Sequence, residues 1–221
     1  MKKIFVVLMS VQFFALAIGS TATRDTLKER SLDEYLRSHH VTQMEGYISE
    51  NTDKQLLFFQ SLFTTHSWIK TVGEIGFNAG HSSECFLSAN SHITVVSFDI
   101  MQHSYVHIGK KYIDLKFPGR HQLVGGNSLS TVQQFHKENI DARFDLIFID
   151  GGHDFDTALN DIKNMKSLAS KKTLLIVDDI NRQSVLNAWN ACLTSGCVKE
   201  IQRFSSGDKA WVMGQYCFPP T

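Results

Sequence analysis

Five short apolar runs, separated by stretches with helical spacing, constrain the fold of this chain more than any other feature. They lie at Val72–Ile75, Ile93–Phe98, Gln122–Val124, Phe144–Ile149 and Leu174–Val177, and an acidic residue or a glycine follows each of them. Strands that helices cover on both faces are nearly continuous in apolar residues. The pattern therefore predicts an α/β fold with a central, mostly parallel sheet and helices on both faces.

The C-terminal part of the chain predicts a different kind of strand pair. Val198–Phe204 and Ala210–Tyr216 are strand-like and flank the tract Ser205-Ser206-Gly207-Asp208, which is rich in turn-forming residues. We expect a terminal antiparallel hairpin, which brings the predicted sheet to seven strands.

One domain accounts for the length of the chain. A chain of 221 residues fits a single α/β domain, and with three prolines we find no linker that would divide it. Apolar residues at helical spacing, such as Leu56, Phe59 and Leu62, predict an N-terminal helical segment over 20–70. The core domain is then expected over 71–221.

The first 19 residues have the features of a secretory signal peptide. Lys2 and Lys3 precede an uncharged apolar stretch, Ile4–Gly19, which is shorter than the roughly 20 residues that span a membrane. We expect export to a periplasmic, extracellular or lumenal space, with no stable membrane insertion after cleavage. The alternatives are a short membrane anchor, which would leave the protein membrane-anchored, and a segment without a targeting role, which would leave it cytoplasmic.

Charge and cysteine content limit the partners of the chain. Lys plus Arg and Asp plus Glu number 22 each, so no overall field attracts nucleic acid or an anionic membrane surface. The four cysteines are Cys85, Cys192, Cys197 and Cys217. An even number in an exported chain permits disulfides, and Cys192 and Cys197 either close a small loop or are ordinary buried thiols. Cys85 is expected in the core.

A loop with two glycines follows the first predicted strand. Glycines let the backbone approach a ligand closely, and the next helix begins with free N–H groups. Gly76 and Gly80 are four residues apart, so the loop lacks the dinucleotide fingerprint. A plain tight turn is the alternative. The candidate cofactor-binding residues here are Glu74, Gly76, Asn78, Gly80 and Ser82, and Asp150 after the fourth strand is a further candidate.

Polar residues at the next two strand ends extend this candidate site. Asp99 follows the second strand, where an acid is placed to bind the hydroxyls of a ribose. Asn127 and Ser128 follow the third strand in a polar turn. They either contact the adenine end of a nucleoside or form an ordinary loop.

Three aspartates follow the fourth and fifth strands. The carboxyl ends of parallel strands meet at one edge of a sheet, so Asp150, Asp178 and Asp179 could present three carboxylates to a hard cation such as Mg²⁺. The alternative is helix capping, by Asp154 or Asp156 after the fourth strand and by Asp179 after the fifth.

His153 is the candidate general base. It lies three residues after Asp150, and imidazole titrates in the range that a general base requires. The other nine histidines, including His103, lack acidic strand-end neighbours, and we expect them to be surface or packing residues.

These motifs resemble class I S-adenosylmethionine (SAM)-dependent methyltransferases. The likeness covers roughly residues 42–216 and is strongest to metal-dependent small-molecule O-methyltransferases, which include catechol, caffeoyl-CoA and macrolide sugar enzymes. It rests on Glu74-Ile-Gly-Phe-Asn-Ala-Gly-His-Ser, Asp99, Phe-Ile-Asp150-Gly-Gly-His153 and Val-Asp178-Asp179.

The resemblance implies SAM as cofactor in a Rossmann-like fold, with a divalent cation, Mg²⁺, held by Asp150, Asp178 and Asp179. The spacing of Asp150 and His153 is similar to that of the sugar-methylating branch, in which the histidine deprotonates the acceptor hydroxyl. Catechol-type relatives have Asn at the position of Asp179. The implied acceptor is therefore a small polar molecule, with its pocket shaped by residues 20–55 and 101–120.

The sequence leaves two alternative functions open, and one of its predictions conflicts with another. The fold could serve a secreted binding module without turnover, or an NAD-linked oxidoreductase. The spacing of Gly76 and Gly80 argues against the oxidoreductase, and the acid cluster with His153 argues against loss of activity. Export conflicts with a cofactor that is made in the cytosol. Homo-oligomerisation is left open.

Overall fold

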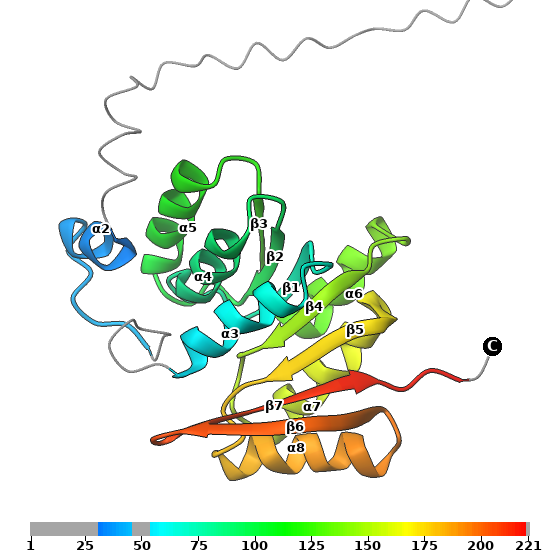
Figure 1. The fold of residues 1–221 in the computed structure, drawn as a ribbon. Helices are drawn as coiled ribbons and strands as arrows, with labels where there is room; N and C mark the ends of the chain where they lie inside the picture. The colour runs from blue at the N-terminus through cyan, green and yellow to red at the C-terminus, as the bar shows by residue number, and fades with distance from the viewer. Residues whose placement is uncertain (1–30, 46–53, 220–221) are drawn as a thin grey trace, which may run out of the picture.

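The computed structural model describes residues 31–45 and 54–219, and its centre is a seven-stranded sheet (Figure 1). The strands are β1 (Thr71–Ile75), β2 (Thr94–Asp99), β3 (His121–Gly125), β4 (Phe144–Ile149), β5 (Ala169–Val177), β6 (Val198–Ser206) and β7 (Lys209–Tyr216). β1 to β5 pair in parallel, and β7 is antiparallel to both β5 and β6. The predicted α/β fold with its terminal hairpin is confirmed. The predicted signal peptide lies outside the described residues.

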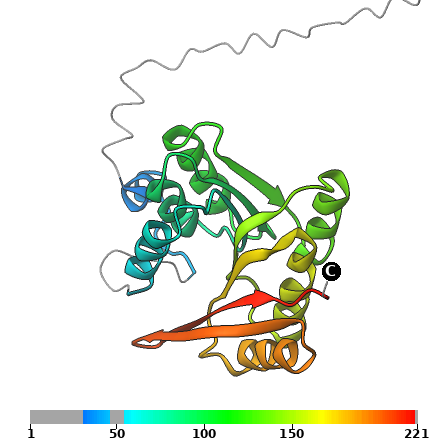
Figure 2. The same ribbon diagram turned by 45° about the vertical axis from the view of Figure 1, so that its right-hand side comes forward.

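Helices cover both faces of the sheet (Figures 1 and 2). One group is α2 (Leu32–Ser38), α3 (Lys54–Thr65), α4 (His81–Ala89) and α5 (Tyr105–Lys116). The other is α6 (Ser128–Glu138), α7 (Phe155–Met165) and α8 (Gln183–Thr194), and a 3₁₀ turn, Lys166–Leu168, follows α7. Each group packs over its own apolar cluster, so the molecule has three layers.

The alternation of side chains along β4 shows how these layers form. Leu146 and Phe148 belong to the cluster under α2 to α5, whereas Ile147 and Ile149 belong to the cluster under α6 to α8. All four are at most 3% exposed. Successive side chains of a strand point to opposite faces, so a strand buried on both faces must be apolar at every position.

The strand order places the site. The order is β3-β2-β1-β4-β5-β7-β6, so the direction in which strands are added reverses between β1 and β4. In open α/β sheets, ligands bind at such a switch point, beyond the carboxyl ends of the strands. The loops after β1, β2, β3, β4 and β5 all begin at that edge.

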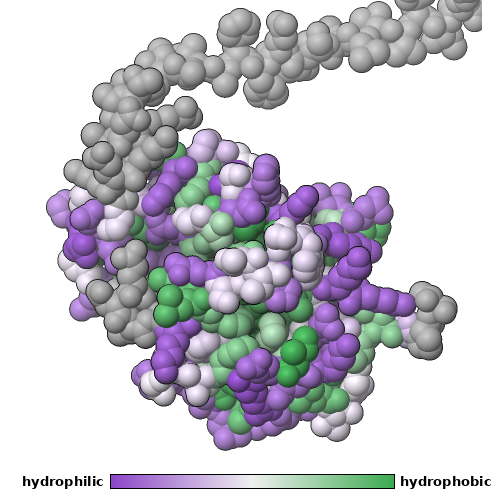
Figure 3. Space-filling model, in the orientation of Figure 1, coloured by the Kyte–Doolittle hydropathy of each residue, from purple (hydrophilic) through white to green (hydrophobic). Residues whose placement is uncertain are grey.

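The outer surface is mixed in character. Figure 3 shows polar residues over most of the visible face, with apolar residues gathered over the part of the sheet beside α3. Leu57 of α3 and Ile201 of β6 are 63% and 48% exposed. Within the described ranges, no helix has the length and apolar character that crossing a membrane requires.

Candidate functional site

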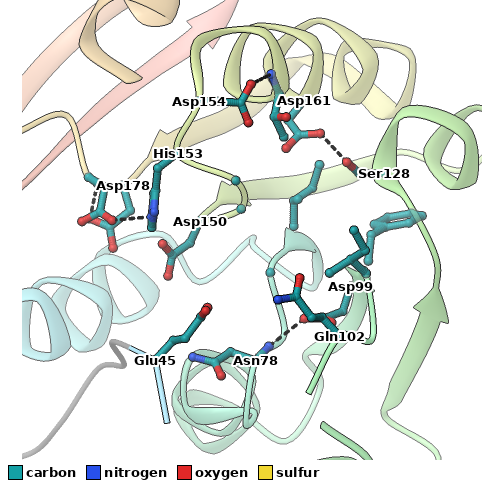
Figure 4. A pocket seen from close by; sticks show the side chains of 18 of the residues that line it. Glu45, Asn78, Asp99, Gln102, Ser128, Asp150, His153, Asp154, Asp161 and Asp178 are labelled. Atoms are coloured by element: carbon teal, nitrogen blue, oxygen red, sulfur yellow. Dashed lines mark hydrogen bonds and ion pairs between the residues drawn. The ribbon is translucent and has the colours of Figure 1, made fainter. Parts of the chain in front are cut away.

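A pocket of about 640 Å³ opens at the carboxyl edge of the sheet (Figure 4). Its lining includes residues from the loops after all five parallel strands, among them Gly76, Asn78, Asp99, Asn127, Ser128, Asp150, His153, Asp178 and Asp179. Nine of the twelve residues predicted from sequence therefore share one cavity. The other three, Glu74, Gly80 and Ser82, do not line it.

The loop after β1 reaches the pocket through Gly76 and Asn78. Both residues have positive φ, 92° and 53°, which turns the chain sharply at the end of the strand. The N–H of Gly76 donates to the Phe98 carbonyl at 2.9 Å, which ties the loop to β2. The main chain of this loop is therefore held at the pocket wall.

Asp99 fixes the same loop from the neighbouring strand. Its Oδ2 accepts the N–H groups of Phe77 and Asn78 at 3.0 and 2.8 Å, and its Oδ1 accepts the N–H of Met101 at 2.7 Å. Figure 4 shows the Asn78 contact inside the cavity. The acid at the end of β2 thus both lines the pocket and orders the loop across from it.

Glu74 lies beneath this loop rather than in the pocket. It is fully buried, and its carboxylate accepts the hydroxyls of Ser82, Ser83 and Ser97, the last two at 2.6 and 2.5 Å. Burial raises the pKa of Glu74, and the three hydroxyls partly oppose this shift. The side chains of Glu74 and Ser82 therefore form a buried network that supports the loop, and their contact with the cofactor stays a prediction.

At the end of β3, Asn127 caps α6 and its neighbour Ser128 contacts an acid that sequence reasoning missed. The Asn127 side chain accepts the N–H of Leu129, and the Ser128 hydroxyl donates to Asp161 Oδ1 at 2.6 Å. Asp161 is 1% exposed, and its Oδ2 has no hydrogen-bond partner among the described residues. Burial raises its pKa to about 6.

The signal for Asp161 was present in the sequence. It shares the buried face of α7 with Ala158, Ile162 and Met165, at helical spacing. A carboxylate on an apolar helix face is costly unless it is paired or lines a polar site. Its position on that face could have marked it as a site residue.

Asp150 and Asp179 form a cluster of possible metal ligands with His153, whereas the sequence predicted Asp178 as the third member. Ligand atoms of Asp150, His153 and Asp179 lie within 4.8 Å of one another. Asp178 lies outside this group and is buried, with its Oδ1 accepting the N–H of Asp179 at 2.9 Å. Desolvation, together with the charges of Asp178 and Asp179, raises the pKa of Asp150 well above its usual range.

Asp179 is the centre of this cluster. Its Oδ2 lies 2.7 Å from His153 Nε2 and 3.2 Å from Arg182 Nε. The hydrogen bond to His153 is the main cause of a lowered pKa for Asp179. Both basic groups therefore favour the ionised carboxylate.

Helix capping was the alternative role for Asp154, Asp156 and Asp179, and it holds for Asp154 alone. Asp154 caps α7 by accepting the N–H of Thr157 at 2.9 Å. Asp179 does not cap α8, because that helix begins after Arg182, which makes no side-chain cap. The capping alternative is wrong for Asp179, whose side chain turns to His153 instead.

Residues before the core and after β2 form another part of the pocket wall. Glu45, Gln102 and His103 line it, as expected for the ranges 20–55 and 101–120. His103 Nε2 lies 3.2 Å from Glu45 Oε1, and its ring stacks on Tyr105 with centroids 4.8 Å apart. His103 was expected to be a surface or packing residue, and it both stacks on Tyr105 and lines the cavity.

The pocket carries an excess of negative charge. Its carboxylates are Glu45, Asp99, Asp150, Asp154, Asp161, Asp178, Asp179 and Asp208. The permanently cationic residues of the lining are Arg182 and Lys209. A concave site lined by one sign of charge attracts ligands of the opposite sign. This cavity therefore favours cationic ligands.

Comparisons with known proteins agree with this geometry. Residues 74–180 match a family of methyltransferase domains. An O-methyltransferase from Bacillus cereus, solved with SAH, has a TM-score of 0.68 at 18% identity and covers 91% of this chain and 94% of its own. The SAM-bound O-methyltransferase TomG from Streptomyces achromogenes scores 0.65 at 14% identity, with 91% and 92% covered.

A TDP-rhamnose 3'-O-methyltransferase of calicheamicin biosynthesis has a TM-score of 0.59 at 14% identity, with 87% of this chain and 93% of its own covered. The comparison with curated proteins gives no match. At these identities the solved structures establish the fold alone. The domain match covers residues 74–180, which contain the loops after β1, β2, β3 and β4. Over residues 74–180 the chain matches the methyltransferase-domain family, and its fold is that of O-methyltransferases of known structure.

Proposed function

We propose that this protein transfers a methyl group from SAM to a hydroxyl of a small polar molecule with the help of a divalent cation. The observation that carries the proposal is that one cavity joins the Gly76–Asn78 loop and Asp99 to the cluster of Asp150, His153 and Asp179. A cofactor and an acceptor bound in that cavity would meet at the cluster.

The cofactor end of the proposal rests on main-chain and carboxylate groups. Gly76 brings the backbone to the pocket wall, and Asp99 is placed beside it to bind ribose hydroxyls. The excess of pocket carboxylates favours a ligand that carries a sulfonium and an ammonium. Asn127 and Ser128 lie farther along the same wall, where the adenine end is expected.

The cluster fits a divalent cation. Asp150 and Asp179 offer two carboxylates, the kind of ligand that Mg²⁺ accepts, and one ligand atom of each lies within 4.8 Å of the other and of His153. Bound there, a cation would lower the pKa of a coordinated hydroxyl, while SAM supplies the methyl group. We assign cation binding to Asp150 and Asp179, with Asp178 behind them.

His153 is the proposed general base, acting at Nδ1, because Nε2 donates its hydrogen bond to Asp179. Asp179 holds the imidazole by its 2.7 Å contact and stabilises the protonated ring after the proton is taken. Because the leaving group is a neutral thioether, no residue is needed to protonate it. The chain therefore contributes positioning, one base and a field suited to cations.

The acceptor is proposed to be polar and sugar-like. Glu45, Gln102 and His103 form a hydrogen-bonding wall of the pocket. The spacing of Asp150 and His153 supports a sugar hydroxyl as the target, and one structural neighbour is a TDP-rhamnose 3'-O-methyltransferase. Export remains a prediction of the N-terminal sequence.

Calorimetric titration of the purified chain with SAM, with and without Mg²⁺, tests the proposal. We expect micromolar binding that weakens at least about tenfold in Asp99→Asn, since that change puts an amide donor against N–H groups. Asp156→Asn, which removes an exposed carboxylate outside the pocket, is the matched control. Absence of SAM binding by the native chain under all conditions would refute the proposed activity.

A further inference from the structure

Helix α8 ends in a Schellman motif that brings two cysteines together, far along the chain from the site described above. Gly196, with φ 67°, is the left-handed residue, and its N–H donates to the Leu193 carbonyl at 3.0 Å. The N–H of Cys197 donates to the Cys192 carbonyl at 2.9 Å. These are the two hydrogen bonds that define the motif.

The motif fixes the separation of the two cysteines. In a Schellman motif, the side chains of these two positions typically contact each other. Standard bond lengths put a Cα about 1.5 Å from its own nitrogen and about 2.4 Å from its own carbonyl oxygen. With the 2.9 Å hydrogen bond between Cys192 and Cys197, their Cα atoms lie within about 7 Å, the outer limit for a disulfide.

We propose that Cys192 and Cys197 form a dithiol–disulfide site that ties the end of α8 to the start of β6. All four cysteines are free thiols in the structure, which therefore shows this pair in its reduced form. Nothing in the proposed methyl transfer uses it.

The two thiols differ in the way that disulfide exchange requires. Cys192 is fully buried in the cluster under α6 to α8, whereas Cys197 is partly exposed. The hydrogen bond from the Cys192 thiol, helped by Lys166 and Lys163, lowers the pKa of Cys197 to about 6. The same hydrogen bond raises the pKa of Cys192. Cys197 is therefore the attacking thiolate and Cys192 the resolving thiol.

The oxidant is a low-molecular-weight disulfide such as oxidised glutathione. The Cys197 thiolate attacks one glutathione sulfur, which forms a mixed disulfide and releases one glutathione thiolate. Cys192 then loses its proton and attacks the Cys197 sulfur, which expels the second glutathione. Two electrons pass from the cysteines to the glutathione disulfide, and the released protons go to the thiolates or to solvent.

Cys217 is the other cysteine that lies close enough along the chain pairing to compete with Cys192 for a disulfide with Cys197. Its N–H donates to the Cys197 carbonyl at 2.9 Å, because the two residues continue the pairing of Val198 with Tyr216. Within the described residues, no three of the cysteine, histidine and acidic ligand atoms gather here closely enough for a metal ion. A disulfide is therefore favoured over a thiolate metal site.

Peptide mapping after incubation with oxidised glutathione tests the pairing without any variant. Trypsin cleaves after Arg182, Lys199 and Lys209, so one peptide, 183–199, holds both Cys192 and Cys197, while Cys217 lies in 210–221. We expect peptide 183–199 lighter by two hydrogens and resistant to alkylation. Alkylation of all four cysteines, or a cross-link between 183–199 and 210–221, would overturn the assignment.

Thermal unfolding gives an independent readout. Closing a six-residue loop raises the Tm by about 4–9 °C relative to the reduced protein. We expect the response to reductant to persist in Cys217→Ser and to disappear in Cys197→Ser. Loss of the response in Cys217→Ser would overturn the pairing in favour of Cys217.

Discussion

Gly76 packs directly against the main chain of Asp150, since a Cβ on Gly76 would lie 2.0 Å from the Asp150 carbonyl oxygen. The N–H of Asp150 in turn donates to the Ile75 carbonyl at 2.9 Å. The cofactor loop and the acidic strand end are therefore locked together at the switch point of the sheet. Cofactor and cation binding are expected to depend on this contact.

Replacing Gly76 with alanine is expected to lower the free energy of unfolding by about 2–5 kcal/mol, through positive φ and overlap with Asp150. Gly119→Ala is the matched control, because Gly119 has φ 73° and open space around it. Backbone strain alone should cost that variant about 1–2 kcal/mol. Urea unfolding measures both, and equal losses would contradict the proposed contact.

Glu74→Ala is expected to destabilise the fold by about 2–4 kcal/mol, because it leaves three buried serine hydroxyls without their acceptor. Glu138→Ala, at the exposed end of α6, should change stability by less than about 0.5 kcal/mol. If Glu74→Ala abolished SAM binding at unchanged stability, Glu74 would be a direct ligand as first predicted from sequence.

Asp161 makes stability depend on pH. Its folded pKa, about 6, is above the usual 3.8, so the native state holds the proton more tightly than the unfolded state. The resulting destabilisation is absent below about pH 4, grows as pH rises to 6, and is constant above. Relative to wild type, Asp161→Asn should therefore gain stability across this window, by a total on the order of 3 kcal/mol.

Urea unfolding of wild type and variant at pH 4.5 and pH 7.5 measures about two thirds of this difference, and titrations common to both proteins cancel. Asp156→Asn, on the exposed side of the same helix, is the matched control for removing a carboxylate from α7. A pH-independent difference for Asp161→Asn would mean that its carboxyl is not desolvated in the native state.

The two adjacent aspartates after β5 are expected to differ in their effect on Mg²⁺ affinity. Asp179 lies in the cluster with Asp150 and His153, whereas Asp178 does not. Asp179→Asn should weaken Mg²⁺ binding more than about tenfold, and Asp178→Asn less than about threefold. Calorimetry with Mg²⁺ distinguishes the two variants. An equal loss of Mg²⁺ affinity in both would support the ligand set Asp150, Asp178 and Asp179 that the resemblance implied.

His153→Asn is expected to lower kcat by a factor of about 10²–10⁴ and to leave Mg²⁺ affinity within about threefold. The readout is turnover with an acceptor found by screening hydroxylated compounds, together with the calorimetric affinity. A parallel loss of Mg²⁺ binding would assign His153 to the cation rather than to the proton.

The sequence by itself determined the order of strands and helices and the residues that end each strand. Runs such as Phe144–Ile149 encode strands buried on both faces, and parallel strands must end at one edge, so Gly76, Asp99 and Asp150 share a cavity. Even the contact of Cys192 with Cys197 follows from a local signal, because Gly196 ends the helix between them.

Tertiary structure decided which of the gathered side chains contact one another. Asp178 and Asp179 are neighbours in sequence, but a φ of 56° at Asp179 helps to direct its side chain to His153 while Asp178 stays buried. Asp161 can be recognised in the sequence as an acid on an apolar helix face, but only the packing of α7 shows that its partner is Ser128 at the pocket wall. Strand ends can be located from local periodicity, whereas side-chain direction at those ends depends on backbone turns and neighbours that are distant in sequence.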